Sequence, residues 1–304
     1  MKPPLHQPVV FTGVLLALLV GAYVVGAAVT VGLFAAIPDS VLFEKGPGKL
    51  MRRLVMVLVI LGLPWVLRRY AWKGWRDNGW KLAAEGACWR KDLIRGFLIG
   101  LVTLGVLVLA GWLVDERLVR PEIAWGMLPV VLVGMVLQGL VVGVLEETLA
   151  RGILFRSMAR MWPVAAAALF SSALFAVGHF LKPQDVAFEA GGGIGPPLWS
   201  MVEFMGSVNR IEWRLPNLIL MSLALCVVVV RTRTIWLAAG LHAGWVFVKE
   251  LSDHIWSWDP SIPYDLVWGQ RSDFTDGLAC MIMLTLVFAW AWRLPQKASA
   301  SADA

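Results

Sequence analysis

The chain has 304 residues, of which 59% are hydrophobic and only 16% are charged, and its formal net charge is +6. This apolar content, gathered in runs longer than the cores of soluble domains use, excludes a soluble globular domain and predicts a polytopic membrane protein. The positive charge would suit a nucleic-acid binder, but it is concentrated in loops between the apolar runs, so we expect no nucleic-acid partner.

The apolar runs predict an all-α fold, a polytopic transmembrane helical bundle with about eight spans. The second and seventh runs are shorter than the roughly 20 residues that cross a bilayer, so we expect them to recruit flanking residues or to enter as partial spans. The first run is too long for a cleaved signal peptide and is interpreted as a retained span. The expected spans are residues 9–37, 54–67, 96–114, 127–145, 163–180, 215–230, 235–248 and 278–292.

The loops between these spans differ in charge. Lys and Arg are more numerous on the side that carries both termini, chiefly because residues 68–95 are rich in them. The positive-inside rule therefore predicts an integral, multi-pass membrane protein with its N- and C-termini in the cytoplasm. Tryptophans interleave with these charges, which is typical either of a segment lying along the membrane surface or of an ordinary connecting loop. Residues 182–214, rich in Gly and Pro, are expected to be mobile and non-helical.

One apolar run is interrupted by charge. Glu146, Glu147 and Arg151 lie within an otherwise apolar stretch, residues 127–155. Ionisable groups at bilayer depth cost about 2.5 to 3.5 kcal/mol each on insertion scales, so they need partners or a wet cavity and usually have a function. Because Glu147 and Arg151 are four residues apart on a helix, we expect them to pair and leave Glu146 facing a cavity. The alternative is a buried charge cluster without chemistry.

Two histidines lie in later apolar runs. His179 belongs to the run 163–180, and His242 stands among small residues that allow close helix approach. A lone histidine in an apolar helix is more often a satisfied core residue than a catalyst. However, an antiparallel hairpin turning near Pro163 would place Glu146 and His179 at one depth, about 24 Å from the turn. A carboxylate and an imidazole at one depth are what the activation of water needs.

These residues resemble the three motifs of the CPBP family of intramembrane proteases, which includes the CAAX prenyl endopeptidases and the Abi proteins linked to bacteriocin processing and self-immunity. The resemblance covers residues 127–248, and its motifs are Glu146-Glu147-x-x-x-Arg151, then Phe175-x-x-x-His179, then His242. It implies a membrane helix bundle with a conical cavity. Position by position, Glu146 matches the catalytic glutamate, Glu147 its neighbour and Arg151 the motif arginine. His179 and His242 match the histidines of the second and third motifs.

The resemblance also implies a division of the chain. Residues 1–126 would hold N-terminal spans and the basic, Trp-rich cytoplasmic loop, and residues 127–250 the CPBP-like catalytic core. Residues 251–304 would form an outer loop, the last span and a disordered tail.

By this resemblance the protein would be an intramembrane endopeptidase that hydrolyses peptide bonds with water activated by Glu146. Its partners would be a membrane-associated peptide or protein substrate and the lipid bilayer. Zinc is left open, which would make the enzyme a metalloprotease. Glu146, His179 and His242 would supply the usual three protein ligands, but Glu146 could not then also be the free base.

One position departs from the family pattern. The third motif commonly carries Asn or another polar residue four positions after its histidine, and here that residue is Val246. Valine can neither ligate a metal nor donate to an oxyanion, and the loss of one oxyanion donor can lower a rate on the order of 100-fold. Lys249, on nearly the same helical face as His242, is a candidate replacement.

Two other functions are alternatives. Val246 favours a catalytically weak or inactive relative that acts as a membrane scaffold or a bacteriocin-immunity-like protein. A transporter in which an intramembrane Glu and His relay protons is the other. Against the transporter, the sequence has no paired broken helices in matching halves of the chain.

Overall fold

The computed structural model describes residues 7–44, 46–70, 74, 76, 78–81, 88–114, 118–119, 125–181, 185–188, 193–206, 214–257, 266–268 and 276–296. The secondary structure in these ranges is helical, apart from one antiparallel pair of two-residue strands, β1 (Leu118–Val119) and β2 (Trp256–Ser257). The all-α class expected from the sequence is therefore confirmed. The tail after Arg293 is expected to be disordered, and from residue 297 onward it lies outside the described residues.

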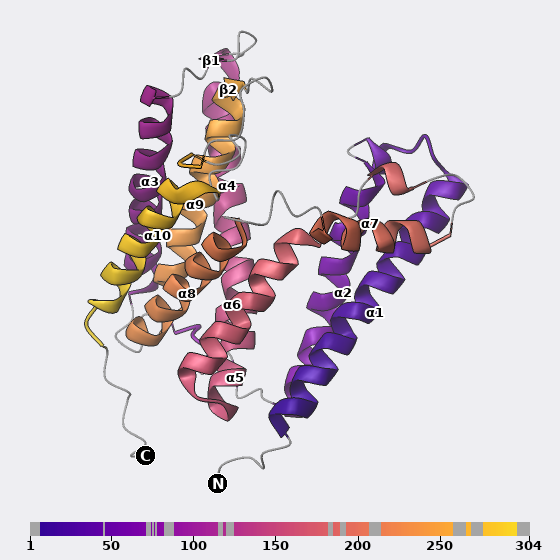
Figure 1. Ribbon diagram of the computed structural model, residues 1–304, viewed down its shortest axis with the longest axis horizontal. Coiled ribbons are helices and arrows are strands. Elements are labelled where there is room, and N and C mark those ends of the chain that lie inside the picture. The colour runs from indigo at the N-terminus through magenta and orange to yellow at the C-terminus, as the bar shows by residue number, and fades with distance from the viewer. Residues whose placement is uncertain are drawn as a thin grey trace. The chain divides into compact units, whose positions relative to one another are not determined.

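Each of the eight predicted spans coincides with a helix (Figure 1). Among the described residues, four helical stretches are long and apolar enough to cross a membrane: α1, α3, α8 and the continuous helix that begins with α4. Two further apolar helices, α6 and α10, are shorter. The eight helices are α1 (Gln7–Ala36), α2 (Pro47–Tyr70), α3 (Trp89–Val114), α4 (Leu128–Glu147), α6 (Val164–Phe180), α8 (Arg214–Thr232), α9 (Trp236–Ile255) and α10 (Gly277–Trp292).

Three helices, α2, α3 and α9, are longer than the apolar runs that predict them, and polar contacts account for the extensions of α2 and α9. α2 begins at Pro47, a favourable first helical position, and a carboxylate oxygen of Asp185 accepts a hydrogen bond from the amide of Gly48, 2.7 Å away. α9 continues past its apolar part, where Lys249 and Asp253 form an ion pair four residues apart. Polar side chains thus extend helices beyond the point where hydropathy stops predicting them.

The segment expected to be non-helical contains a helix, α7 (Gly195–Gly206). Its two prolines, Pro196 and Pro197, lie in the first turn, where the backbone N–H groups have no partner within the helix and a fixed φ favours helix initiation. The expectation of non-helical chain is therefore wrong for this part of residues 182–214. Gly195, Pro196 and Pro197 stand at the start of a helix, where they do not break it.

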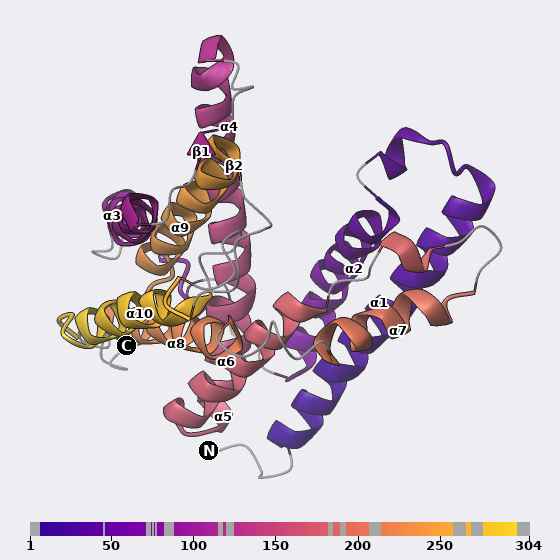
Figure 2. The same ribbon diagram turned by 45° about the horizontal axis from the view of Figure 1, so that its top comes forward.

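The helices form two compact units. The first comprises residues 1–72, 160–163 and 176–211. In it α1 and α2 run side by side (Figure 2). Their helices approach closely at Gly26, where a Cβ atom would lie 2.8 Å from Cγ2 of Val55. One buried hydrophobic cluster of this unit comprises Ala22, Ala27, Met51, Val55 and Phe188.

The second unit comprises residues 73–159, 164–175 and 212–304, and α9 is its most buried helix. Every residue of α9 from Trp236 to Trp245 is buried. α3 packs against α9 with almost no side chain between the two backbones, because glycines face each other across the contact. A Cβ added at any of them would collide with the backbone of the other helix, and these glycines are Gly96 and Gly100 on α3 and Gly240 and Gly244 on α9.

The outer surface of α4 is apolar. Val130, Val133, Leu137 and Val141 are exposed and recur every three or four residues, so they form one stripe along the helix. A stripe of this kind is unfavourable in water and suited to lipid. It agrees with an integral membrane protein.

Part of the Trp-rich loop packs on α9. The amide of Ile235 donates to the carbonyl of Gly79, and Nε1 of Trp236 donates to the carbonyl of Lys81, 2.9 Å away. The ring of Trp80 meets Trp236 edge to face, with centroids 4.9 Å apart. Residues 78–81 are therefore anchored to the protein, whereas residues 71–73, 75, 77 and 82–87 lie outside the described ranges.

Candidate active site

The acidic pair lies where the helical winding changes. Glu146 and Glu147 end α4, and the chain continues without a break through a π-helical segment, η4 (Thr148–Phe155), into α5 (Arg156–Met161). π-helical turns are rare and occur frequently at functional sites. The side chain of Glu146 is 35% exposed, whereas that of Glu147 is fully buried. The two neighbouring carboxylates therefore have different environments.

Glu147 forms the ion pair that its spacing predicts. Nη1 of Arg151 lies 2.7 Å from Oε1 of Glu147, and both side chains are buried. Charge-assisted hydrogen bonds of this length are strong, and a buried carboxylate needs such a partner. Glu147 is therefore paired with a cation that comes from the same continuous helix.

His242 meets both glutamates. Its Nδ1 lies 2.9 Å from Oε1 of Glu147, and its Nε2 lies 3.9 Å from Oε2 of Glu146. A carboxylate can only accept, so Nδ1 of His242 carries a proton, and in the neutral form of the ring Nε2 would present a lone pair toward Glu146. The sequence predicted His242 as a partner of Glu146 and did not indicate its hydrogen bond to Glu147.

Glycines on α4 bring these side chains together. A Cβ atom at Gly143, one turn before Glu147, would lie 2.6 Å from the carbonyl oxygen of Ala239 on α9. A Cβ atom at Gly139 would lie 2.7 Å from the carbonyl oxygen of Ala243. Side chains larger than hydrogen at these two positions would push α9, and with it His242, away from the acidic pair.

Glu146, Glu147, Arg151 and His242 form a cluster of charged and polar side chains. The ring of Phe175, from α6, packs against this cluster. The guanidinium carbon of Arg151 lies over this ring, 4.5 Å from its centroid, in cation–π geometry. The ring of His242 approaches the same phenyl group edge to face, with centroids 6.2 Å apart. Phe175 therefore packs on both partners of Glu147. The sequence placed Phe175 in a motif but gave it no role of its own.

His179 follows Phe175 by one turn of α6 and is half-buried. It belongs to the first compact unit, whereas Glu146 and His242 belong to the second. Its expected place beside Glu146 therefore stays a prediction.

Val246 and Lys249, which follow His242 on α9, have different surroundings. Val246 is half-buried, one turn after His242. The ammonium group of Lys249 lies 2.7 Å from Oδ2 of Asp253 and 3.7 Å from Oε1 of Glu250. Asp253 is one turn farther from His242, so this ion pair draws the ammonium group away from His242, and the replacement of the missing polar group by Lys249 stays a prediction.

The residues of the cluster do not assemble a three-ligand metal site. In the part of the chain that the structure describes, no group of three or more His, Cys, Asp or Glu side chains is arranged to hold a metal ion. Oε1 of Glu147 already accepts hydrogen bonds from Arg151 and His242. The two possible ligand atoms that face each other are Oε2 of Glu146 and Nε2 of His242. Zinc bound by Glu146, His179 and His242 stays a prediction.

Three buried polar atoms of the cluster have no hydrogen-bond partner among the described residues. They are Oε2 of Glu147 and Nε and Nη2 of Arg151. Buried polar atoms are usually satisfied by protein or by ordered water, and such water makes about three hydrogen bonds. The cluster therefore has polar capacity for water beyond the bonds within the protein.

Fold and site together define an integral membrane protein with a carboxylate–imidazole cluster built into its helices. Residues 124–248 match the family described as type II CAAX prenyl endopeptidase, Rce1-like. The resemblance to the CAAX protease family is thereby confirmed over this segment, which contains every residue of the cluster. No curated protein and no solved structure matches the chain.

Proposed function

We propose that the protein is an intramembrane endopeptidase that cleaves membrane-associated peptides or proteins with water activated by Glu146. One observation carries the proposal. A partly exposed carboxylate lies 3.9 Å from an imidazole whose other nitrogen is fixed by a buried ion pair. Glu146 and Glu147 thereby take different roles: Glu147 orients the imidazole, and Glu146 is the carboxylate open to a reactant.

The proposed reaction is a hydrolysis in which the proton passes through Glu146. Glu146 takes a proton from water, and the resulting hydroxide adds to the carbonyl carbon of the scissile peptide bond. The tetrahedral intermediate carries its negative charge on the former carbonyl oxygen. The carbon–nitrogen bond then breaks, and Glu146 returns the proton to the leaving amine. Glu147 and Arg151 stay charged throughout and do not exchange protons with the substrate.

The histidines are proposed to act on the water and on the oxyanion. Nε2 of His242, facing Glu146, would accept a hydrogen bond from the attacking water and hold its lone pair toward the substrate carbon. His179 is proposed as the oxyanion donor because a neutral imidazole has an N–H to offer and because the motif order supports it. Val246 would contribute nothing to the oxyanion, so we expect turnover to be slow.

The test is cleavage of a farnesylated peptide with a C-terminal CAAX sequence by the full chain in detergent, followed by mass spectrometry of the products. The Glu146→Gln variant keeps the shape of the side chain and removes its basicity, so we expect a rate loss of about 100- to 10,000-fold. Glu250→Gln, the same change outside the cluster, should retain the wild-type rate. Unchanged cleavage by Glu146→Gln would remove Glu146 from the mechanism.

The second candidate is a binding protein that uses the same residues without turnover, which the valine at position 246 favours. It predicts that the farnesylated peptide binds and is recovered intact. Val246→Asn separates the two candidates: an enzyme that lacks a donor should gain rate, whereas a binding protein should gain none.

A further inference from the structure

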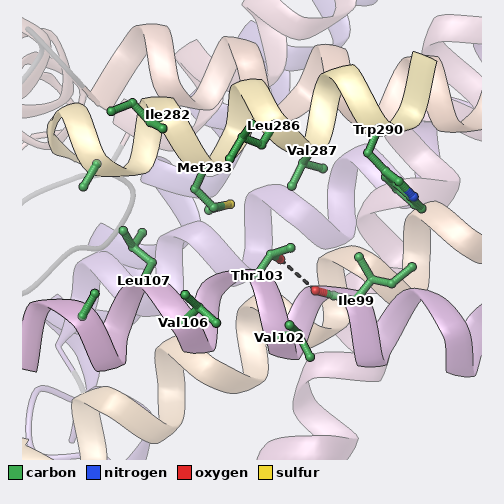
Figure 3. A pocket seen from close by; sticks show the side chains of 12 residues that line it. Ile99, Val102, Thr103, Val106, Leu107, Ile282, Met283, Leu286, Val287 and Trp290 are labelled. Atoms are coloured by element: carbon green, nitrogen blue, oxygen red, sulfur yellow. Dashed lines mark hydrogen bonds between the residues drawn. The ribbon is translucent and has the colours of Figure 1, made fainter. Parts of the chain in front are cut away.

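An apolar groove runs between α3 and α10, away from the acidic cluster (Figure 3). Its volume is about 480 Å³, within the range of small-molecule sites. Only one lining residue, Thr103, has a hydroxyl group, and this hydroxyl donates to the carbonyl of Ile99 one turn earlier, 2.8 Å away. The other side chains facing the groove are hydrocarbon or thioether groups, with Trp290 at one end. The groove therefore offers apolar contact and almost no hydrogen bonding.

The groove has the length of one leaflet. Its lining runs from Ile99 to Ala110 on α3 and from Ala279 to Trp290 on α10. At 1.5 Å per helical residue, each stretch measures about 16 Å. A leaflet contributes about 15 Å of the roughly 30 Å hydrocarbon core. An occupant lying along the groove would thus cross a single leaflet, as an acyl chain does.

Arginines continue the groove at one end only. Arg95 precedes Ile99 by four residues, and Arg293 follows Trp290 by three, so both lie on the helical faces that line the groove. Both arginines are exposed. At the other end, the described residues of α3 and α10 include no Lys or Arg.

A third cation lies at the same end. The guanidinium carbon of Arg231, in the last turn of α8, is 5.2 Å from the ring centroid of Trp292. Arg231 is half-buried, so it is less accessible to a ligand than the two exposed arginines. Positive charge at the end of a leaflet-long apolar groove complements a phosphate attached to a hydrocarbon chain.

We propose that this groove binds an anionic glycerophospholipid, with one acyl chain between α3 and α10 and the headgroup phosphate beside Arg95 and Arg293. The lipid takes the place of side chains that would otherwise fill the gap between these helices. Val106 and Leu286, exposed by 61% and 66%, become covered on the side that faces the groove. The proposal does not depend on the proteolytic activity.

The test is native mass spectrometry of the full chain in a non-ionic detergent with palmitoyl-oleoyl phosphatidylglycerol or palmitoyl-oleoyl phosphatidylcholine. We expect one retained lipid and a preference for phosphatidylglycerol. Arg95→Gln and Arg293→Gln should each weaken this preference about fivefold, because each arginine near an anionic lipid contributes a comparable factor. Arg90→Gln is the matched control: Arg90 lies at the same end of α3 on the opposite helical face, over Trp89.

Filling the groove tests the position of the chain. Val106→Trp places a bulky ring in the groove from an exposed position and should abolish retention of both lipids. Ala289→Phe enlarges an exposed residue of α10 that does not line the groove and should retain them. Equal thermal unfolding of the two variants in lipid-free detergent would show that both are folded.

Three results would overturn the proposal. The first is equal retention of the two lipids, unaffected by either arginine substitution. The second is displacement of phosphatidylglycerol by an equimolar farnesylated peptide, which would assign the groove to a substrate chain. The third is a dimer of the lipid-free wild type that Val106→Trp dissociates, which would assign the groove to a second copy of the chain.

Discussion

Nδ1 of His242 lies 2.9 Å from Oε1 of Glu147, the same oxygen that accepts from Arg151. Helix α9 supplies the imidazole, and α4 and η4 supply its carboxylate and the counter-charge. A histidine held through one nitrogen presents the other in a fixed direction, here toward Glu146. In the proposed mechanism, the fully buried Glu147 is therefore a positioning residue and the partly exposed Glu146 is the residue that acts on water.

The first prediction concerns the charge of Glu147. Glu147→Gln leaves the buried guanidinium of Arg151 without a counter-charge, so we expect a loss of unfolding free energy of about 3 to 5 kcal/mol. The measurement is reversible unfolding in mixed micelles of detergent. The double variant Glu147→Gln, Arg151→Met removes both charges and should lose less than Glu147→Gln alone. Equal stability of Glu147→Gln and the wild type would contradict the charge balance described here.

The second prediction concerns the contact between α4 and α9. Gly143→Ala would place a Cβ atom 2.6 Å from the carbonyl oxygen of Ala239, and the resulting overpacking should destabilise the protein by about 1 to 3 kcal/mol. The displaced His242 should also lower the rate of hydrolysis. Gly134→Ala on the same helix is the control, because no atom lies within 4 Å of its added Cβ. A Gly143→Ala variant as stable and active as Gly134→Ala would refute the close approach.

The third prediction concerns the phenyl ring of Phe175. Phe175→Leu keeps an apolar side chain but removes the ring face under Arg151, a contact of about 1 kcal/mol in a partly desolvated site. We expect about a fivefold lower kcat with a smaller change in KM, since Phe175 packs on the groups that position His242. Phe175→Tyr retains the ring and should restore the wild-type rate. A leucine variant indistinguishable from the tyrosine variant would show that the ring only fills space.

The fourth prediction concerns His179. His179→Ala should lower the rate on the order of 100-fold if its imidazole donates to the oxyanion. His254→Ala, in the last turn of α9, is the matched control and should leave the rate unchanged. Metal content is measured on the same samples. If zinc is present in the wild type and lost only in His179→Ala, His179 is a metal ligand. The proposal that Glu146 acts as a free base would then have to be abandoned.

Hydropathy predicted where helices lie because an apolar run long enough to cross a bilayer has few alternatives to a helix. It failed where polar interactions extend or begin a helix. The end of α9 depends on the ion pair between Lys249 and Asp253, and the start of α7 depends on prolines at tolerated positions. A hydropathy average scores residues one at a time. It therefore registers neither the pairing of Lys249 with Asp253 nor the position of the prolines in the first turn of α7.

The candidate site was predictable in part. The four-residue spacing predicted the pair of Glu147 and Arg151, since a helix places such residues on one face. It could not predict that His242 bonds to Glu147 more closely than to Glu146, because that choice depends on the rotation of α9 against α4. The π-helical turn after Glu147 also changes the direction of the side chains that follow, and the sequence carries no clear signal for it.

Glycines of α3 and of α4 contact the backbone of α9 on two sides, and this packing restricts the movement of α9. Where its backbone touches α3 and α4, no flexible side chain is available to absorb a displacement, so rolling or sliding α9 would drive carbonyl oxygens into neighbouring α-carbons. The packing of α9 therefore holds the His242 imidazole at a fixed position relative to α3 and α4. In the proposed reaction, entry of the substrate and release of its fragments would depend on movements of helices other than α9.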